Sequence, residues 1–123
     1  MERERDIHRL DKINRLLKEE VGKIILKELD LDRNALVTIT QVKTSSDLAH
    51  ATIFFSTLAK TQEKETLAAL EKGVYEIQHI LNRKLRMRPV PKIRFAPDAS
   101  VDVEHRLYDI LSNPHDDSKE IRA

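Results

Sequence analysis

The sequence predicts one α+β domain made of two long helices and three short strands. Two segments carry apolar residues at steps of three and four, which is the spacing of one helix face. Three shorter segments are rich in β-branched residues or alternate apolar with polar residues, as strands do. Along the chain these segments follow the order helix, strand, strand, helix, strand. A chain of 123 residues has room for one hydrophobic core, so we expect a single domain.

The first helix is predicted over residues 5 to 29. Its apolar residues lie on one side of a helix, and this side should face the core. They are Leu10, Ile13, Leu17, Val21, Ile24 and Ile25. Asp30, Asp32 and Asn34 then favour turns and end the pattern.

A β-hairpin is predicted next, with strands over residues 35 to 42 and 49 to 56 joined by a polar turn. Alternation in the second strand puts Ile53 and Phe55 on one face and Phe54 on the other. Phe54 could stack on an RNA base, or residues 103 to 111 could cover it. We favour the cover.

The second helix is expected to begin at Thr61, a suitable N-cap, with Glu63 and Glu65 near the positive end of the helix dipole. Its helical pattern continues until Pro89 and Pro91 forbid it. The apolar stripe consists of Leu67, Leu70, Val74, Ile77 and Leu81.

The third strand is predicted over residues 91 to 96, where Ile93 and Phe95 alternate with Lys92 and Arg94. A short amphipathic piece within residues 103 to 111 should add a final turn or two of helix. Residues 113 to 123 are polar, acidic and without periodicity, so we expect a disordered tail after a domain of residues 1 to 112.

Composition excludes several classes of function. The chain has no cysteine, hence no disulfide and no thiolate chemistry, and its five histidines show no metal-binding spacing. It lacks glycine-rich phosphate loops, and we expect neither a cofactor nor catalysis. No apolar run approaches the roughly 20 residues of a membrane span, so a cytoplasmic protein is expected.

Positive charge is concentrated in one stretch. Residues 1 to 97 carry 19 bases and 14 acids, whereas residues 98 to 123 carry three bases and seven acids. No acid occurs from Ile77 to Pro97. On a continuous helix, His79, Arg83 and Arg86 would project away from Leu81, and Lys92 and Arg94 should point outward from the sheet. The cations of this stretch are Arg83, Lys84, Arg86, Arg88, Lys92 and Arg94.

Such a run is often only a solvated face, but solvated faces usually mix charges of both signs, and this one does not. The pattern therefore supports phosphate binding about as strongly as it supports a solvated face. In the first helix, Arg5, Arg9, Lys12 and Arg15 alternate with acids that could neutralise them, so a solvated face is the better interpretation there.

Two strings of residues resemble the ribosome-binding factor A family. One runs from Val42 to Ala51 around the hairpin, and the other from Ile80 to Phe95 between the second helix and the third strand. Asp98-Ala99-Ser100 also resembles the ending of the family's domain. The resemblance covers roughly residues 5 to 112.

The resemblance implies a type II KH-like domain, with helices on one face of a three-stranded sheet and a kinked second helix. It also implies association with free or immature 30S small ribosomal subunits and 16S rRNA, near the terminal rRNA helix and the neck. The resemblance further implies that the protein assists late rRNA processing and cold adaptation, and that a GTPase aids its release from the subunit. The protein itself would catalyse no reaction.

Three positions depart from what the resemblance leads us to expect. The chain has only Gly22 and Gly73, so the Gly-x-x-Gly clamp of a standard KH domain, which family members also lack, is absent. The kink sequence is Gly73-Val74-Tyr75, with tyrosine where glycine is usual, so a kink would centre on Gly73, although a straight helix would fit as well. Leu31-Asp32-Arg33 stands where Asp-Pro-Arg is common.

Our hypothesis is that the acid-free stretch binds phosphates of folded rRNA, with further contacts from Lys43, Ser45 and Ser46 of the hairpin. Turn serines, however, more often bond locally. One alternative is a general single-stranded RNA-binding KH-like module. A second is a dimerising interaction module, whereas we expect a monomer.

Overall fold

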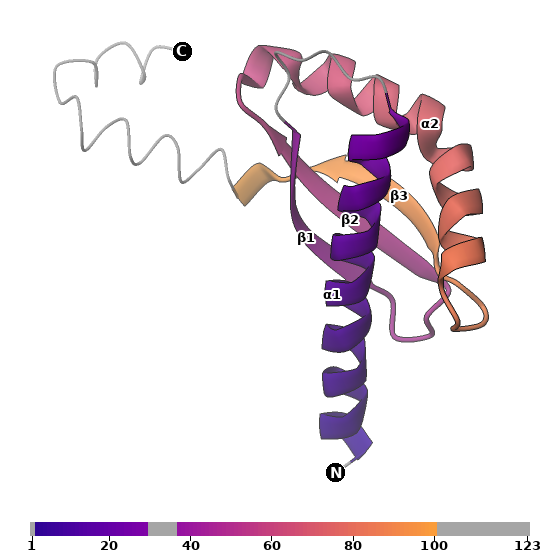
Figure 1. The fold of residues 1–123 in the computed structure, drawn as a ribbon. Coiled ribbons are helices and arrows are strands. Elements are labelled where there is room, and N and C mark those ends of the chain that lie inside the picture. The colour runs from indigo at the N-terminus through magenta and orange to yellow at the C-terminus, as the bar shows by residue number, and fades with distance from the viewer. Residues whose placement is uncertain (1, 30–36, 101–123) are drawn as a thin grey trace, which may run out of the picture.

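The computed structural model describes residues 2–29 and 37–100, which form an α+β fold. Figure 1 shows the helices packed on one side of a three-stranded sheet. The elements are α1 (Glu2–Glu28), β1 (Val37–Thr44), β2 (His50–Thr57), the short 3-10 helix η1 (Lys60–Gln62), α2 (Glu63–Lys84) and β3 (Lys92–Pro97). The predicted fold class and element order are confirmed.

The sheet has the order β1-β2-β3, with β1 antiparallel and β3 parallel to the central strand β2. Val42 pairs with Ile53, and Ile53 pairs with Phe95. Their side chains are buried together with Phe55, which is 0% exposed. The predicted alternation of β2 is therefore correct, and it leaves the odd-numbered residues of β2 and β3 beneath the helices.

Helix α1 is buried only along its second half, where Leu17, Val21 and Ile24 enter the core. Figure 1 shows its N-terminal end projecting past the sheet. Asn14 attaches the helix to β1, because its Oδ1 accepts hydrogen bonds from the Thr44 backbone N–H (3.0 Å) and hydroxyl (2.6 Å). These contacts fix α1 across the sheet.

The ends of α2 differ from the prediction. Thr61 lies inside η1, the N-cap position is Gln62, and no side chain caps the helix. The helix ends at Lys84, short of Pro89, because Leu85 takes an extended backbone (φ −84°, ψ 139°). This turn brings the Leu85 side chain into the core, where it is 6% exposed. The helix therefore ends before it reaches the prolines.

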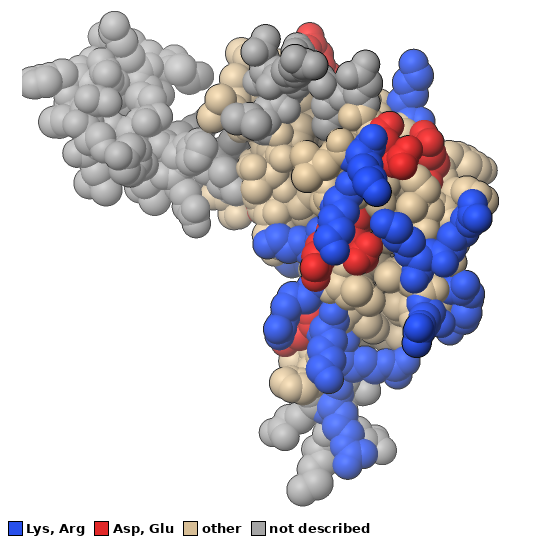
Figure 2. All heavy atoms as spheres, in the orientation of Figure 1, with Lys and Arg blue, Asp and Glu red and all other residues tan. Residues whose placement is uncertain are grey.

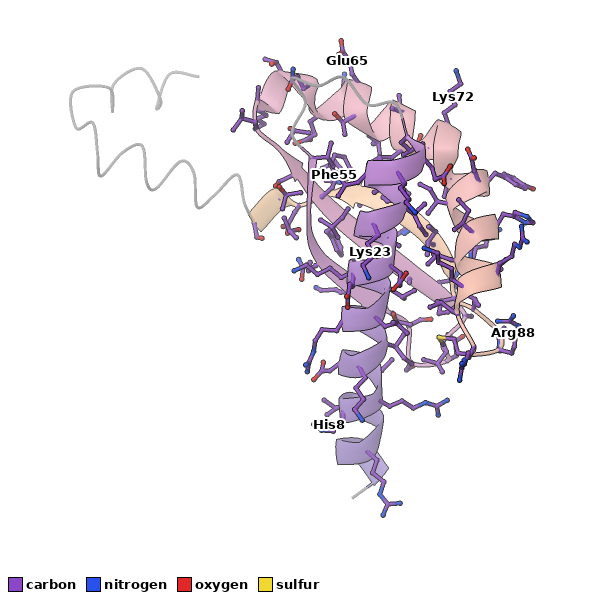
Figure 3. The ribbon with its side chains drawn as sticks, in the orientation of Figure 1. His8, Lys23, Phe55, Glu65, Lys72 and Arg88 are labelled. Carbon is purple, nitrogen blue, oxygen red and sulfur yellow. The ribbon has the colours of Figure 1, made fainter. Side chains whose placement is uncertain are left out.

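Figure 1 shows α2 changing direction along its length, next to Lys72, which is labelled in Figure 3. This position agrees with a kink at Gly73. A Cβ atom at Gly73 would lie 2.5 Å from the Leu29 Cδ2 atom. Glycine therefore allows the end of α1 to approach α2 closely.

Several expectations concern residues outside the described ranges. They are the exit of the first helix at residues 31 to 33, the amphipathic piece of residues 103 to 111, the cover of Phe54 by it, and the tail of residues 113 to 123. The domain boundary at residue 112 stays a prediction. Within residues 2–29 and 37–100, no helix is both long and apolar enough to span a bilayer.

Candidate nucleic-acid interface

Four cations surround the C-terminal end of α2, and we call them the helix-end cluster: Arg83, Lys84, Arg86 and Arg88. All four side chains are exposed. The Lys84 Nζ atom lies 3.9 Å from Glu20 Oε2, a long ion pair between an exposed lysine and a half-buried glutamate. Arg83 and Arg86 form no hydrogen bond or ion pair with any described residue, so both guanidinium groups are available to a ligand.

Arg86 was predicted to share a helix face with His79 and Arg83, and this prediction is wrong. It lies beyond the last residue of α2, in the segment that leads to β3. In the same segment Arg88 Nη1 donates to the carbonyl oxygens of Leu85 and Met87, both at 2.7 Å. Arg88 therefore satisfies carbonyl groups where the helix ends, and it has a structural role besides its charge.

A second group, the sheet-face cluster, consists of Lys43, Lys92 and Arg94. Thr52 pairs with both Lys43 and Arg94, so Lys43, Thr52 and Arg94 form a row across the three strands. Arg94 Nε donates to the Thr52 hydroxyl at 3.1 Å, and Lys43 Nζ lies 5.8 Å from the centroid of the Phe54 ring. The prediction that Lys92 and Arg94 point away from the core is confirmed by their exposure beside buried Ile93 and Phe95.

The outer face of the sheet has a shallow hollow of about 370 Å³ next to this row. It is lined by Lys43, Thr44, Ser45, His50, Thr52 and Arg94. His50 and Thr52 were not among the site residues predicted from the sequence, although strand alternation places both on the same face as Phe54. Cations and hydroxyl groups without a lining carboxylate suit an anion.

The hairpin turn uses Ser45 for its own structure. The Ser45 hydroxyl donates to Asp47 Oδ1 (2.6 Å), and it accepts the His50 backbone N–H (3.0 Å). Leu48 has a positive φ of 61°, which the turn requires. The bond from Ser45, followed by that from the Ala49 N–H, lowers the pKa of Asp47. The Ser45 hydroxyl is therefore used in hydrogen bonds within the turn, which was the alternative interpretation of the turn serines.

Lys92 connects the two clusters across the free edge of β3. Its side chain lines a groove of about 440 Å³ between α2 and β3, opposite His79 and Asn82. The helix-end cluster begins at Arg83, the residue that follows Asn82 on α2. The sheet-face cluster extends along β3 from Lys92 to Arg94. The predicted cations therefore extend from the helix side around one edge to the outer face of the sheet.

Figure 2 shows the helix side of the molecule, where Lys and Arg side chains gather along α1 and around the C-terminal end of α2. On α1 the ion pairs among described side chains join Lys23 to Glu19 (3.3 Å) and to Glu20 (3.6 Å). Arg9, Lys12 and Arg15 take part in none of these pairs. They lie exposed on the first half of the helix, as a solvated face would.

Asp98 is the buried carboxylate of the described chain, with 7% exposure. Its Oδ1 accepts the Ser100 hydroxyl (2.5 Å) and backbone N–H (3.0 Å), and its Oδ2 accepts bonds from Thr40 and Gln41. Hydrogen bonds from Ser100 and then Thr40 lower the pKa of Asp98. These bonds join β1 to the end of β3, which is a structural role.

Within the described ranges, no group of three or more His, Asp or Glu side chains is placed to hold a metal ion. The candidate interface is therefore a surface of fixed positive charge with two hollows. A surface of this kind suits the binding of phosphate groups.

Comparison with known proteins identifies relatives over most of the chain. The sequence profile of the family described as ribosome-binding factor A matches residues 9–111. Ribosome-binding factor A of Lacticaseibacillus casei is 36% identical over 107 residues, which cover 85% of this chain and 92% of that protein.

Two solved structures share the fold. The crystal structure of ribosome-binding factor A from Thermus thermophilus has a TM-score of 0.60 at 24% identity, covering 72% of this chain and 94% of that one. Coordinates of the Thermus factor fitted into a cryo-EM map of a 30S complex give a TM-score of 0.59, again at 24% identity, with 69% and 90% covered.

Proposed function

The chain belongs to the ribosome-binding factor A family, and on this premise we propose that it binds the small ribosomal subunit through phosphate groups of 16S rRNA. The observation that carries the proposal is the exposed cationic surface formed by the helix-end and sheet-face clusters, in which Lys84 lies 3.9 Å from Glu20 and Arg83 and Arg86 pair with no described residue. The Thermus relative, whose coordinates were fitted into a map of a 30S complex, supports the choice of partner.

Phosphate contacts would position the protein on folded RNA by shape, since they carry no sequence information directly. Arginine suits this role because its planar guanidinium group binds phosphate with two parallel hydrogen bonds. Arg83 and Arg86 are exposed and form no hydrogen bond or ion pair with the described residues. Their guanidinium groups could therefore bind RNA without breaking a bond inside the protein.

We further propose that binding assists late maturation of the small subunit and 16S rRNA processing in the cytoplasm, without a reaction catalysed by the protein itself. Support comes from the family and from the kind of groups at the surface, which are cations and hydroxyls suited to holding RNA. From the same family resemblance we propose that the protein assists growth in the cold and that a GTPase aids its release.

Sedimentation of cell extracts tests this proposal. The variant Arg83→Glu/Arg86→Glu/Lys92→Glu reverses three charges whose side chains bond to no described residue, so the fold should be unaffected. We expect the wild type to co-sediment with free 30S subunits and the variant to remain near the top of the gradient.

The matched control is Lys27→Glu/Lys64→Glu/Lys72→Glu, which reverses three exposed charges elsewhere. Figure 3 shows Lys72 midway along α2 and Arg88 in the segment that follows the C-terminal end of the helix. The control should still co-sediment with 30S subunits. Equal loss of binding in both variants would mean that net charge, and not this surface, determines binding.

A further inference from the structure

The hollow on the outer face of the sheet, about 370 Å³ in volume, is lined by side chains from all three strands. Lys43 lies on β1, His50 and Thr52 lie on β2, and Arg94 lies on β3. No carboxylate lines the hollow. It therefore gathers hydrogen-bond donors from three strands around one small volume.

Arg94 and Thr52 are oriented by a hydrogen bond between them. Arg94 Nε donates to the Thr52 hydroxyl at 3.1 Å, and neither side chain has another hydrogen-bond partner among the described residues. This bond uses one of the five N–H groups of the guanidinium group, so both terminal NH₂ groups remain available. The hydroxyl is only an acceptor in this bond, so it can donate its own proton to a ligand.

Lys43 and His50 add donors on two other sides of the hollow. Lys43 Nζ lies 5.8 Å from the centroid of the Phe54 ring, a cation–π contact that favours a position over the outer face. The His50 side chain is exposed and bonds to no described residue. An imidazole ring carries at least one N–H group in either protonation state, so His50 can donate as well.

Two hydroxyl groups at the hollow are already used within the protein. The Thr44 hydroxyl donates to Asn14 Oδ1 (2.6 Å), and the Ser45 hydroxyl donates to Asp47 Oδ1 (2.6 Å). Each hydroxyl has one proton, so neither group can donate to a ligand while these bonds are present. The donors available to a ligand are those of Lys43, His50, Thr52 and Arg94.

The charge and number of these donors match a terminal phosphate better than a phosphate within an RNA chain. A phosphate within a chain carries one negative charge and has two free oxygen atoms. A terminal phosphate carries about −1.5 to −2 charges at pH 7 and has three acceptor oxygens. Lys43 and Arg94 supply two positive charges, and four side chains supply donors, which a phosphate within a chain would leave partly unused.

We propose that this hollow binds the terminal phosphate of an RNA strand. Arg94 and Thr52 would bond to its oxygen atoms, and Lys43 would balance the second charge. His50 would donate to the remaining oxygen. The inference rests on the proposed function and deepens it, because it assigns the end of a strand to this hollow and phosphates within the chain to the helix-end cluster.

The surrounding charge favours RNA over a phosphorylated peptide. Lys92 pairs with His50 between β2 and β3, and its exposed side chain continues the positive charge from the hollow to the edge of the sheet. A strand with a phosphate on every nucleotide can follow these cations. A peptide with a single phosphate would occupy the hollow alone.

The affinity of short oligouridines, labelled on one internal base and measured by fluorescence anisotropy, tests the proposal. Two hexamers carry a terminal phosphate, one at the 5′ end and the other at the 3′ end. The reference is an octamer without a terminal phosphate, whose two additional internal phosphates give it nearly the same total charge. We expect one hexamer or both to bind at least about fivefold more tightly than the octamer, and the tighter hexamer identifies the end that is bound.

Variants that conserve every charge separate the hollow from general attraction to RNA. Thr52→Val removes the hydroxyl group, and Arg94→Lys keeps the charge but removes the planar guanidinium group. Each should bring the affinities for the preferred hexamer and the octamer to within about twofold. Thr38→Val, at an exposed threonine of β1 outside the hollow, is the matched control and should keep the preference.

Three results would overturn the proposal. The first is equal affinity of the wild type for the octamer and both hexamers. The second is a preference that either Thr52→Val or Arg94→Lys retains in full. The third is displacement of the hexamer by a peptide with one phosphoserine at a lower concentration than by the unlabelled hexamer itself, which would indicate a protein partner instead of RNA.

The variant Arg83→Glu/Arg86→Glu/Lys92→Glu distinguishes failure of this inference from failure of the proposed function. It leaves the four donor side chains of the hollow in place, so it should lose 30S binding and keep the preference for a terminal phosphate. Failure of the wild type to bind 30S subunits would reject the proposed function, whereas a preference for the phosphorylated hexamer would still support the hollow.

Discussion

At the scale of single residues, side chains predicted from sequence as ligands divide into two kinds. Arg83 and Arg86 are exposed and unbonded among the described residues, as a phosphate contact requires. Arg88 and Ser45 instead bond to nearby backbone and turn atoms. Charge and residue type indicated all four, but only the coordinates show which donors remain available, because internal bonds depend on where the backbone turns.

Asp98 gives the first prediction at this scale. Replacing it with alanine leaves the Thr40, Gln41 and Ser100 donors without their acceptor and should lower the free energy of unfolding at pH 7 by about 1 to 3 kcal/mol. Urea denaturation measures this change. Asp98→Asn, which keeps an acceptor oxygen but no charge, should show a smaller loss.

The pH dependence of this effect has a definite sign. Hydrogen bonds to the carboxylate hold the pKa of Asp98 below its ordinary 3.8 in the folded protein. Its contribution to stability is therefore complete above that value and is lost as the pH falls through the lowered pKa. The stabilities of the wild type and Asp98→Asn should therefore approach each other as the pH falls below 3.8. A constant difference down to pH 2 would contradict this role.

At the scale of elements, periodicity predicted the helices and strands well, and their ends less well. The stripe of α1 and the alternation of β2 depend on local spacing, which sequence displays directly. The end of α2 was predicted from Pro89 and Pro91, whereas the backbone leaves the helix at Leu85, which the local pattern did not indicate. The kink at Gly73 stays a prediction, and the close approach of Leu29 to this glycine joins residues far apart in sequence.

The two glycines give a prediction at this scale. Both lie within helices, where alanine is favoured over glycine by about 0.5 to 1 kcal/mol. A Cβ atom at Gly22 meets nothing within 4 Å, so Gly22→Ala should stabilise the protein by this amount. Gly73→Ala should gain less or destabilise, because Leu29 must move. Thermal or urea unfolding measures both.

A double variant tests the cause. Shortening Leu29 to alanine removes the atom that a Cβ at Gly73 would meet. In this background Gly73→Ala should therefore recover the helix-propensity gain expected of Gly22→Ala. Equal stabilisation by the two glycine variants in the wild-type background would show that Leu29 does not limit the position.

At the scale of the whole molecule, the sequence predicted which cations are exposed better than how they are arranged. The acid-free stretch from Ile77 to Pro97 indicated the surface, and strand alternation correctly placed Lys92 and Arg94 outward. The groove between α2 and β3 was not predicted, because it requires the helix and the edge strand to be placed side by side. The cationic surface and the groove both include the edge of the sheet formed by β3.

The central claim is that this surface binds rRNA by neutralising phosphates, and the salt dependence of binding to purified 30S subunits tests it most directly. With six phosphates neutralised, a plot of the logarithm of the binding constant against that of salt concentration should have a slope of about −5. Arg83→Gln/Arg86→Gln/Lys92→Gln should reduce its magnitude by about 3. A wild-type slope near zero, or one that the variant leaves unchanged, would contradict the account.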